Sequence, residues 1–108
     1  MEISERINKA NPTTTTITFT GFEDADKSLR TEYESMHTCK KIDAIFWCVG
    51  STGYVELKTG EDENIFLSGN GKWDLSTLKD SIEVTGGIEL AADGFEKGDT
   101  FTIILSGR

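Results

Sequence analysis

The sequence has little of the chemistry that most enzymes and metalloproteins use. It contains one histidine, His37, and two cysteines, Cys39 and Cys48, in 108 residues. A structural zinc site needs four ligands, commonly in C-x2-C or H-x3-H pairs, and neither spacing occurs here. A nucleophilic Cys–His pair would also need an orienting group and an oxyanion hole, and no motif supplies them. We therefore expect no catalytic residue, no metal and no cofactor, and we predict that the chain is not an enzyme.

Long apolar runs and an excess of positive charge are also missing. No run approaches the roughly 20 residues that span a membrane, and MEISERINKA at the start lacks the basic and apolar segments of a signal peptide. The formal net charge is −8, which repels phosphate and anionic lipid. We expect neither nucleic acid nor a membrane as partner, and a chain that stays in the compartment where it is made.

The residues that are abundant favour extended backbone. TTTTITFTGF at 13–22 alternates β-branched polar residues with Ile17 and Phe19, which is the pattern of a half-buried strand. Short stretches of similar character recur between glycine-rich turns. They predict an all-β fold, a single sandwich of jelly-roll or immunoglobulin-like type with seven or eight short strands. The expected strands are 13–22, 41–49, 54–59, 65–67, 82–84, 88–90 and 100–106.

The first twelve residues differ from the rest because they are polar and end at Pro12, the one proline. Ile3 and Ile7 are too few to hold a separate helix. We therefore divide the chain into an N-terminal arm, 1–12, and a sandwich domain, 13–108. The arm is expected to be mobile in the isolated domain and to become ordered against a neighbouring subunit.

The stretch 41–49 is apolar on both faces. Ile45, Trp47 and Val49 share one parity, whereas Ile42, Ala44, Phe46 and Cys48 share the other. We expect this strand to be covered on both sides, within the domain or by a partner. Cys39 and Cys48 would lie too far apart along one strand to pair, so both should be free thiols, with Cys48 buried and unreactive.

The alternating pattern also gives a predicted core. Its members lie on the apolar parity of the expected strands: Ile17, Phe19, Ile45, Trp47, Val49, Val55, Leu57, Ile82, Val84, Ile88, Leu90, Phe101, Ile103 and Leu105. Between the strands we expect a glycine loop at 68–72 and a short helix at 74–81 capped by Asp74. Strands 82–84 and 88–90 flank Gly86 and Gly87 with the spacing of a hairpin.

Two loops concentrate carboxylates, Glu23 to Asp26 and Glu61 to Glu63. Meeting loops of a sandwich can hold Ca²⁺, which takes six to eight oxygen ligands, but neither loop has the spacing of a known calcium motif. A solvated charged loop is the favoured interpretation. A pair of carboxylates at the separation that glycosidases use stays open, because sequence does not show the distance.

The segment DGFEKGDTFTIILSG, 93–107, resembles the closing turn and strand of small β-sandwich virion proteins of tailed bacteriophages: head decoration, auxiliary capsid and fibre proteins. The layout is also similar, with a short polar arm, a threonine-rich first strand, an acidic sandwich and an end on a strand. The resemblance implies no catalytic residue. It implies binding to a protein shell or to neighbouring subunits, often as symmetric copies.

Two functions follow as hypotheses. The first is a non-enzymatic structural or assembly protein, made in the host cytoplasm and placed on the outside of a virion. Its interface candidates are Ile3, Ile7, Phe22, Tyr54 and Trp73, and a homo-oligomer or symmetric copies on a larger assembly are expected. The second is a carbohydrate-binding module in which Trp73 and Tyr54 stack on sugar rings, which a glycan array on wild type and Trp73→Ala would test.

Overall fold

The computed structural model describes residues 1–11, 13–25, 30–60, 64–75 and 81–108. It confirms an all-β sandwich. Its ten strands are β1 (Glu2–Asn11), β2 (Thr14–Phe22), β3 (Thr31–Glu34), β4 (Lys41–Gly50), β5 (Tyr54–Lys58), β6 (Asn64–Leu67), β7 (Asn70–Asp74), β8 (Ile82–Glu83), β9 (Glu89–Asp93) and β10 (Thr100–Gly107). In the described part of the chain, no helix is long and apolar enough to cross a membrane.

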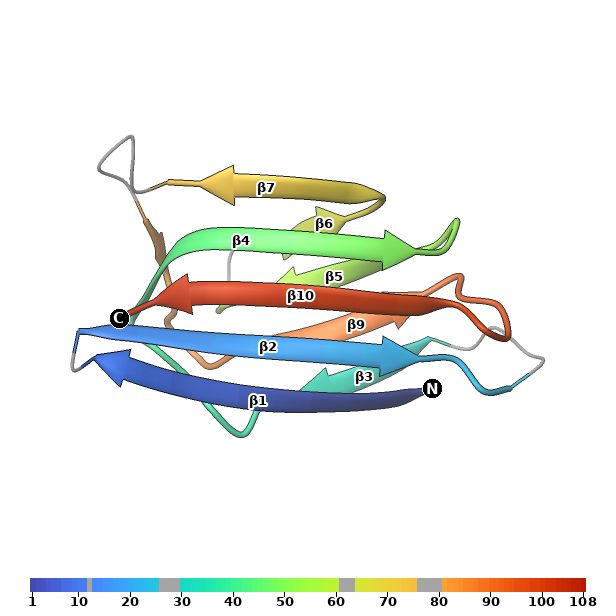
Figure 1. Ribbon diagram of the computed structural model, residues 1–108, viewed down its shortest axis with the longest axis horizontal. Helices are drawn as coiled ribbons and strands as arrows, with labels where there is room; N and C mark the ends of the chain where they lie inside the picture. Colours follow the sequence, from blue (N-terminus) through green and yellow to red (C-terminus); the bar gives the residue numbers. More distant parts are fainter. Residues whose placement is uncertain (12, 26–29, 61–63, 76–80) are drawn as a thin grey trace.

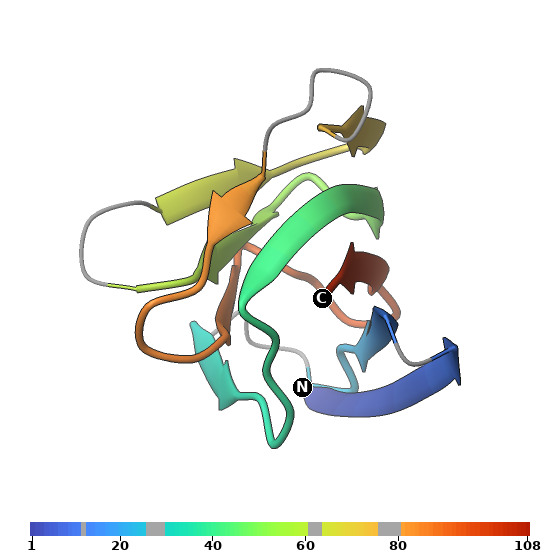
Figure 2. The same cartoon turned by 90° about the vertical axis from the view of Figure 1, so that its left-hand side faces the viewer.

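The strands form two antiparallel sheets that pack face to face (Figures 1 and 2). The larger, sheet A, has six strands in the order β1-β2-β10-β4-β7, with β8 paired to β4 beside this path. The smaller, sheet B, has the order β3-β9-β5-β6. Each sheet therefore has one face toward the common core and one face outward, as in other sandwiches.

Alternation along β2 and β10 sets the two faces of sheet A. Ile17 lies opposite Leu105, and Phe19 lies opposite Ile103, and all four are buried. The threonines between them point outward. The sequence therefore specifies this register, because a slip of one residue would exchange the buried and outward sets.

A β-bulge at Asp43 changes the parity along β4. Ser106 of β10 pairs with Ala44, but the next residue, Gly107, pairs with Ile42, so Asp43 is one extra residue on β4. As a result Ile42 and Ile45 both reach the core, although their sequence positions predict opposite faces. The expectation that Ile42 lies on the other face is wrong for this reason.

The core lies between the sheets and contains most of the predicted residues. Trp47, Ile82 and Val84 are half-buried and pack against it rather than inside it. Among the described residues, the predicted core lacks six buried hydrophobic residues: Ile42, Leu67, Leu75, Ala91, Ala92 and Phe95.

The N-terminal segment is not an arm. It forms β1, which pairs with β2 in a continuous register from Glu2–Phe22 to Asn8–Thr16. Ile3 and Ile7 point inward and pack against the core. The expectation of a mobile arm is wrong, because residues 3, 5 and 7 face inward and alternate with outward residues, which makes an edge strand. The inward residue at the middle of this strand, Glu5, is a carboxylate.

Three local expectations also change. Residues 70–74 form β7 instead of part of a loop, and Gly71 pairs with Trp47 of β4, whose ring occupies the space where a Cβ atom at residue 71 would stand. Strands β8 and β9 join different sheets and make no hairpin. Asp74 ends β7, and the helix expected after it falls mostly on 76–80, outside the described residues.

Candidate functional site

The outer face of sheet A carries no charged residue along β2, along β10 and along β4 from Ala44 onward, and we call this surface the neutral face. Its outward positions carry hydroxyls, small residues and apolar side chains, and none of them is buried. They are Thr14, Thr16, Thr18, Thr20 and Phe22 on β2, Thr100, Thr102, Ile104 and Ser106 on β10, and Ala44, Phe46, Cys48 and Gly50 on β4. No side chain in this set carries a charge at neutral pH.

Two aromatic rings make this surface apolar at separate places. Phe22 is 47% exposed at one end of β2, and Phe46 is 41% exposed on β4. The ammonium of Lys72, which belongs to the neighbouring strand β7, lies over the Phe46 ring at 4.9 Å from its centroid and makes a cation–π contact. The neutral face therefore offers two exposed anchors for a partner within a hydroxyl-rich surround.

Charged side chains return on the outer strands of sheet A. Glu2 and Arg6 point outward from β1, which adjoins β2. On the opposite edge, Lys72 and Asp74 point outward from β7, with 4.0 Å between Nζ and Oδ2. The neutral face therefore has a rim with both signs of charge, which is the usual anatomy of a protein interface.

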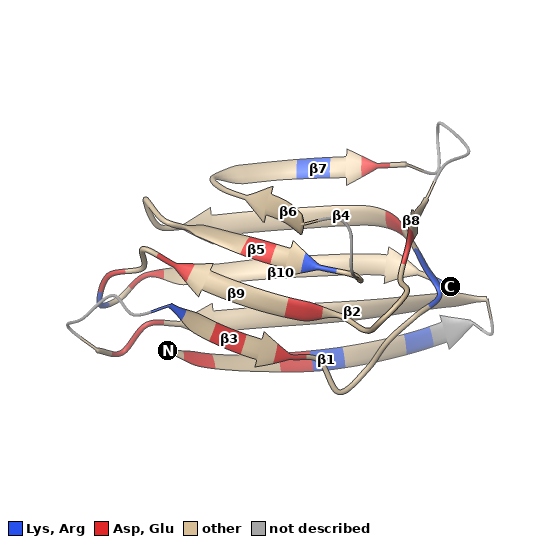
Figure 3. Cartoon of the chain, turned by 180° about the vertical axis from the view of Figure 1, so that it is seen from behind, with Lys and Arg blue, Asp and Glu red and all other residues tan. Residues whose placement is uncertain are grey.

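Sheet B presents a different outer face, which is acidic (Figure 3). Its outward carboxylates are Glu32 and Glu34 on β3, Glu56 on β5, and Glu89 and Asp93 on β9. Arg30 crosses this face. Its Nη2 donates to Glu56 Oε2 at 2.9 Å, and Nη1 lies 3.7 Å from Asp93 Oδ2. The hydrogen bond to Glu56 raises the pKa of Arg30, and Glu56, which is only 6% exposed, has a charged partner.

The cysteine and histidine residues do not form a site. His37 and Cys39 precede β4, whereas Cys48 lies near its far end. Both thiols are free, as predicted. Cys48 is exposed on the neutral face, so the expectation that it is buried is wrong: the layer expected over this side of β4 is absent from the described chain. Burial raises the pKa of the Cys39 thiol.

One of the two acidic loops, through Glu23, contributes to the stability of the fold. Glu23 is buried, its main chain bonds to that of Gly98 and Asp99, and its Oε1 accepts a bond from Ala25 N at 3.1 Å. Asp26 and the segment 61–63 lie outside the described residues. Among the described residues no group of three or more His, Cys, Asp or Glu side chains could hold a metal ion.

The five predicted interface residues lie in different parts of the molecule. Phe22 is on the neutral face, and Ile3 and Ile7 face the core. Tyr54 lies on the outer face of sheet B, with its ring edge-on to Phe66 at 5.5 Å. Trp73 is 41% exposed on the inward side of β7, opposite Ile45. Tyr54 and Trp73 therefore do not share a face on which a sugar could stack.

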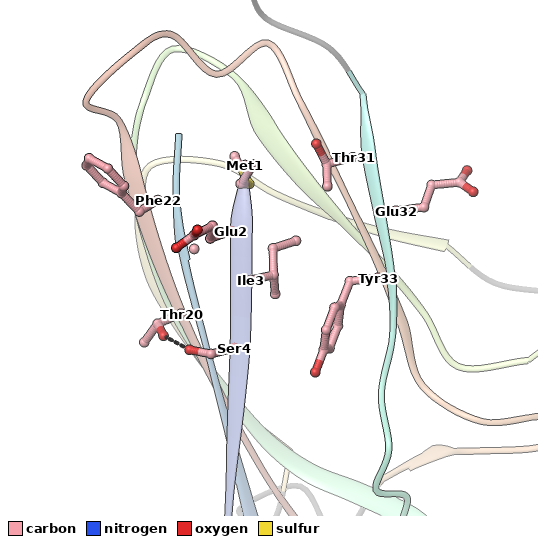
Figure 4. A pocket seen from close by; sticks show the side chains of 10 residues that line it. Met1, Glu2, Ile3, Ser4, Thr20, Phe22, Thr31, Glu32 and Tyr33 are labelled. Carbon is pink, nitrogen blue, oxygen red and sulfur yellow. Dashed lines mark hydrogen bonds between the residues drawn. The ribbon is translucent and has the colours of Figure 1, made fainter. Parts of the chain in front are cut away.

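A groove of about 630 Å³ opens where β1, β2 and β3 begin or end (Figure 4). Ile3 and Tyr33 line its inner side, while Ser4 and Thr20 lie on the other side of β1 with a hydroxyl–hydroxyl hydrogen bond of 2.8 Å. Phe22 belongs to both the groove and the neutral face. The groove is thus an extension of the neutral face at the β1 edge.

The half-buried carboxylate of Glu5, on the edge strand β1, links the two sheets beside this groove. Its Oε1 accepts hydrogen bonds from Tyr33 Oη and Met36 N, both at 2.7 Å, and its Oε2 accepts one from Ser35 Oγ at 2.6 Å. Burial by itself would raise the pKa of Glu5, but these hydrogen bonds together hold it below its ordinary value. Burial, with the bond to Glu5, raises the pKa of Tyr33 to about 12. No pattern in the sequence predicts this cluster, because the partners of Glu5 lie about thirty residues away along the chain.

Comparisons with known proteins add little. No protein-family model and no curated protein matches the chain. Similar solved structures include a cupin superfamily protein from Desulfitobacterium hafniense DCB-2, with 10% identity, a TM-score of 0.43, and coverage of 98% of this chain and 77% of that one. A cupin-2 domain containing protein from Shewanella frigidimarina NCIMB 400 has 14% identity, a TM-score of 0.38, and coverage of 97% and 80%. A conserved protein of unknown function from Streptococcus pyogenes has 12% identity, a TM-score of 0.38, and coverage of 96% and 74%. At these values we transfer no activity, metal or partner from any of them.

Proposed function

We propose that this chain is a non-enzymatic structural or assembly protein that acts through protein–protein contacts, with the neutral face as its docking surface. One observation carries the proposal. Charged residues make up 28% of the sequence, yet the outward positions of β2, of β10 and of β4 from Ala44 onward have none. A surface that stays in water has no need to exclude charge in this way.

Excluding charge matters when a surface is buried against another protein. A charged group that loses its water without gaining a partner costs several kcal/mol, whereas threonine and serine hydroxyls can bond across an interface or to trapped water. The cores of interfaces are accordingly depleted of charged residues and enriched in aromatic rings. Phe22 and Phe46 supply such rings here.

The proposed setting is the outside of a virion, on a protein shell, as the resemblance of residues 93–107 implies. Within that assembly the neutral face would contact a neighbouring subunit, and the acidic outer face of sheet B would stay exposed to solvent. The same acidity disfavours contact with packaged nucleic acid. The absence of an enzymatic role, of a cofactor and of a membrane partner is part of the same proposal.

The reactivity of Cys48 tests the docking surface. In a Cys39→Ser background, Cys48 is the sole thiol, and it lies on the neutral face. We expect a maleimide to label it in the dilute purified protein and to label it much more slowly in the cells that naturally produce the protein. A matched control is a Thr52→Cys variant with both native cysteines changed to serine, because Thr52 lies in the exposed turn before β5.

Equal labelling of Cys48 in cells and in dilute solution would sink the proposal, provided that the Thr52→Cys control is labelled equally in both. Protection of both thiols would point to restricted entry of the reagent into the cells. Labelling after gentle lysis removes that barrier, so that only a thiol buried against a partner remains protected. Protection of Cys48 alone supports docking through the neutral face.

A further inference from the structure

We infer that the partner on the neutral face is a second copy of this chain, bound face to face about a twofold axis. This inference rests on the proposed function, since it names the occupant of the docking surface. Three properties of the described residues support it: the distribution of charge, the area of the face, and the mixed signs of its rim.

The distribution of charge shows which face two copies of this chain could share. Two copies, each with a net charge of −8, repel one another at long range. They can approach closely only through a region that adds no further repulsion and buries no unpaired carboxylate. The neutral face meets this requirement. The outer face of sheet B does not, because it carries five carboxylates, of which only Glu32, Glu56 and Asp93 lie near Arg30. A basic partner would instead gain most from sheet B.

The area of the face matches what a dimer needs. The path from β1 to β7 contains five strands, and β10 is eight residues long. At a spacing of about 4.8 Å between strands and a rise of about 3.3 Å per residue, the outer surface of sheet A, which is the neutral face together with its rim strands β1 and β7, covers about 600 Å² in projection. Protruding side chains increase the accessible area above this value, which brings it near the roughly 800 Å² per partner of a standard interface.

The rim favours one relative orientation of the two copies. Glu2 and Arg6 point outward from β1, and a twofold axis perpendicular to the strands lays β1 of one copy antiparallel over β1 of the other, so that Glu2 of each copy faces Arg6 of its partner. An axis parallel to the strands would instead bring Arg6 over Lys72, because these two residues lie in the same row of sheet A. Packing of two sheet faces at about 10 Å with strands inclined by about 30° is the usual arrangement.

Thr102 is the position at which a substitution tests this arrangement most sharply. It lies on β10, directly between Thr20 of β2 and Cys48 of β4. A Thr102→Lys variant places an ammonium at the centre of the face while it makes the net charge less negative by one unit. General repulsion between copies therefore decreases, and only burial of the new charge opposes association. Thr52→Lys makes the same change of charge in a turn outside the face and is the matched control.

Light scattering after size exclusion, over a dilution series, measures the result. We expect the wild type and Thr52→Lys to show about twice the chain mass of 11.9 kDa at the higher concentrations. Thr102→Lys should remain at the chain mass at the same concentrations, a loss of at least tenfold in association. Thr20→Lys on β2 serves as a second variant of the face, and circular dichroism with thermal unfolding verifies that each variant is folded.

A wild type that remains monomeric at every concentration overturns the second copy as partner. If Cys48 is nevertheless protected in cells, the docking function stands with another protein as partner, so the two failures are distinguishable. A dimer that persists in both Thr102→Lys and Thr20→Lys also overturns the inference, because its interface then lies elsewhere.

Discussion

Replacement of Glu5 should loosen the edge of the sandwich at which β1 faces sheet B. Glu5 is the inward carboxylate of β1, and it receives hydrogen bonds from Tyr33, Ser35 and Met36 in and after β3. In Glu5→Ala all three donors lose their acceptor at once. In Glu5→Gln the side chain keeps its length but loses its charge, and one of its two terminal atoms becomes a donor.

The magnitude follows from the number and kind of bonds. A hydrogen bond to a charged group contributes about 1.5–3 kcal/mol when it is buried. Glu5 is half-buried, so water can replace part of what is lost. We therefore expect Glu5→Ala to lower the free energy of unfolding by about 2–4 kcal/mol, and Glu5→Gln by about half as much. Glu34→Ala removes an exposed carboxylate from β3 and should change it by less than about 0.5 kcal/mol.

Chemical denaturation at a series of pH values measures the effect and its cause. The folded state holds the pKa of Glu5 below its ordinary value of 4.5. The stabilisation from its charge is therefore complete above the ordinary value and is lost as the pH falls through the lowered one. The stability difference between wild type and Glu5→Gln should be constant near neutral pH and shrink in acid. A difference that is the same at neutral pH and in acid would refute the assigned role of the carboxylate.

Three further predictions concern packing and the thiols. Ile103→Ala, at a fully buried position of β10, should cost about 2–5 kcal/mol in denaturation experiments, and an unchanged midpoint would remove this residue from the core. Gly71→Ala should cost about 1–3 kcal/mol and shift the fluorescence of Trp47, whose ring its Cβ would displace; unchanged stability would contradict the packing. In dilute native buffer, Ellman's reagent should react with Cys48 faster than with Cys39, because burial raises the pKa of the Cys39 thiol, and the reverse order would contradict the placement of Cys48.

The fold could be predicted where alternation is strict. In β2 the buried Ile17 and Phe19 alternate with threonines, and in β10 Phe101, Ile103 and Leu105 share one parity, so both strands and their buried side follow from the sequence alone. In β4 the sequence is apolar on both sides, and a bulge at Asp43 depends on the partner strand rather than on local residue types. Alternation also says nothing about Phe95, which is buried from a loop against Phe101 with 5.8 Å between ring centroids.

The candidate site was predicted less well than the fold. The two apolar faces of 41–49 predicted a cover on both sides of this strand, and a partner on the outer side stays a prediction. The neutral character of the whole face requires knowledge of which strands are neighbours. β2 and β10 are separated by most of the chain, and their threonines meet only through the register of Thr20 with Thr102. In the same way, Glu5 interrupts the apolar alternation of Ile3 and Ile7, and its partners in and after β3 are visible only in the folded chain.

The most direct test of the central claim is the labelling rate of Cys48 as a function of protein concentration in the Cys39→Ser variant. If the neutral face is buried against a second copy, the rate constant should fall as the concentration rises, and it should do so equally in Thr52→Lys. In Thr102→Lys the neighbouring ammonium will alter the rate itself, but the rate should no longer depend on concentration. A Cys48 rate constant that is the same at every concentration in the parent variant would contradict the account.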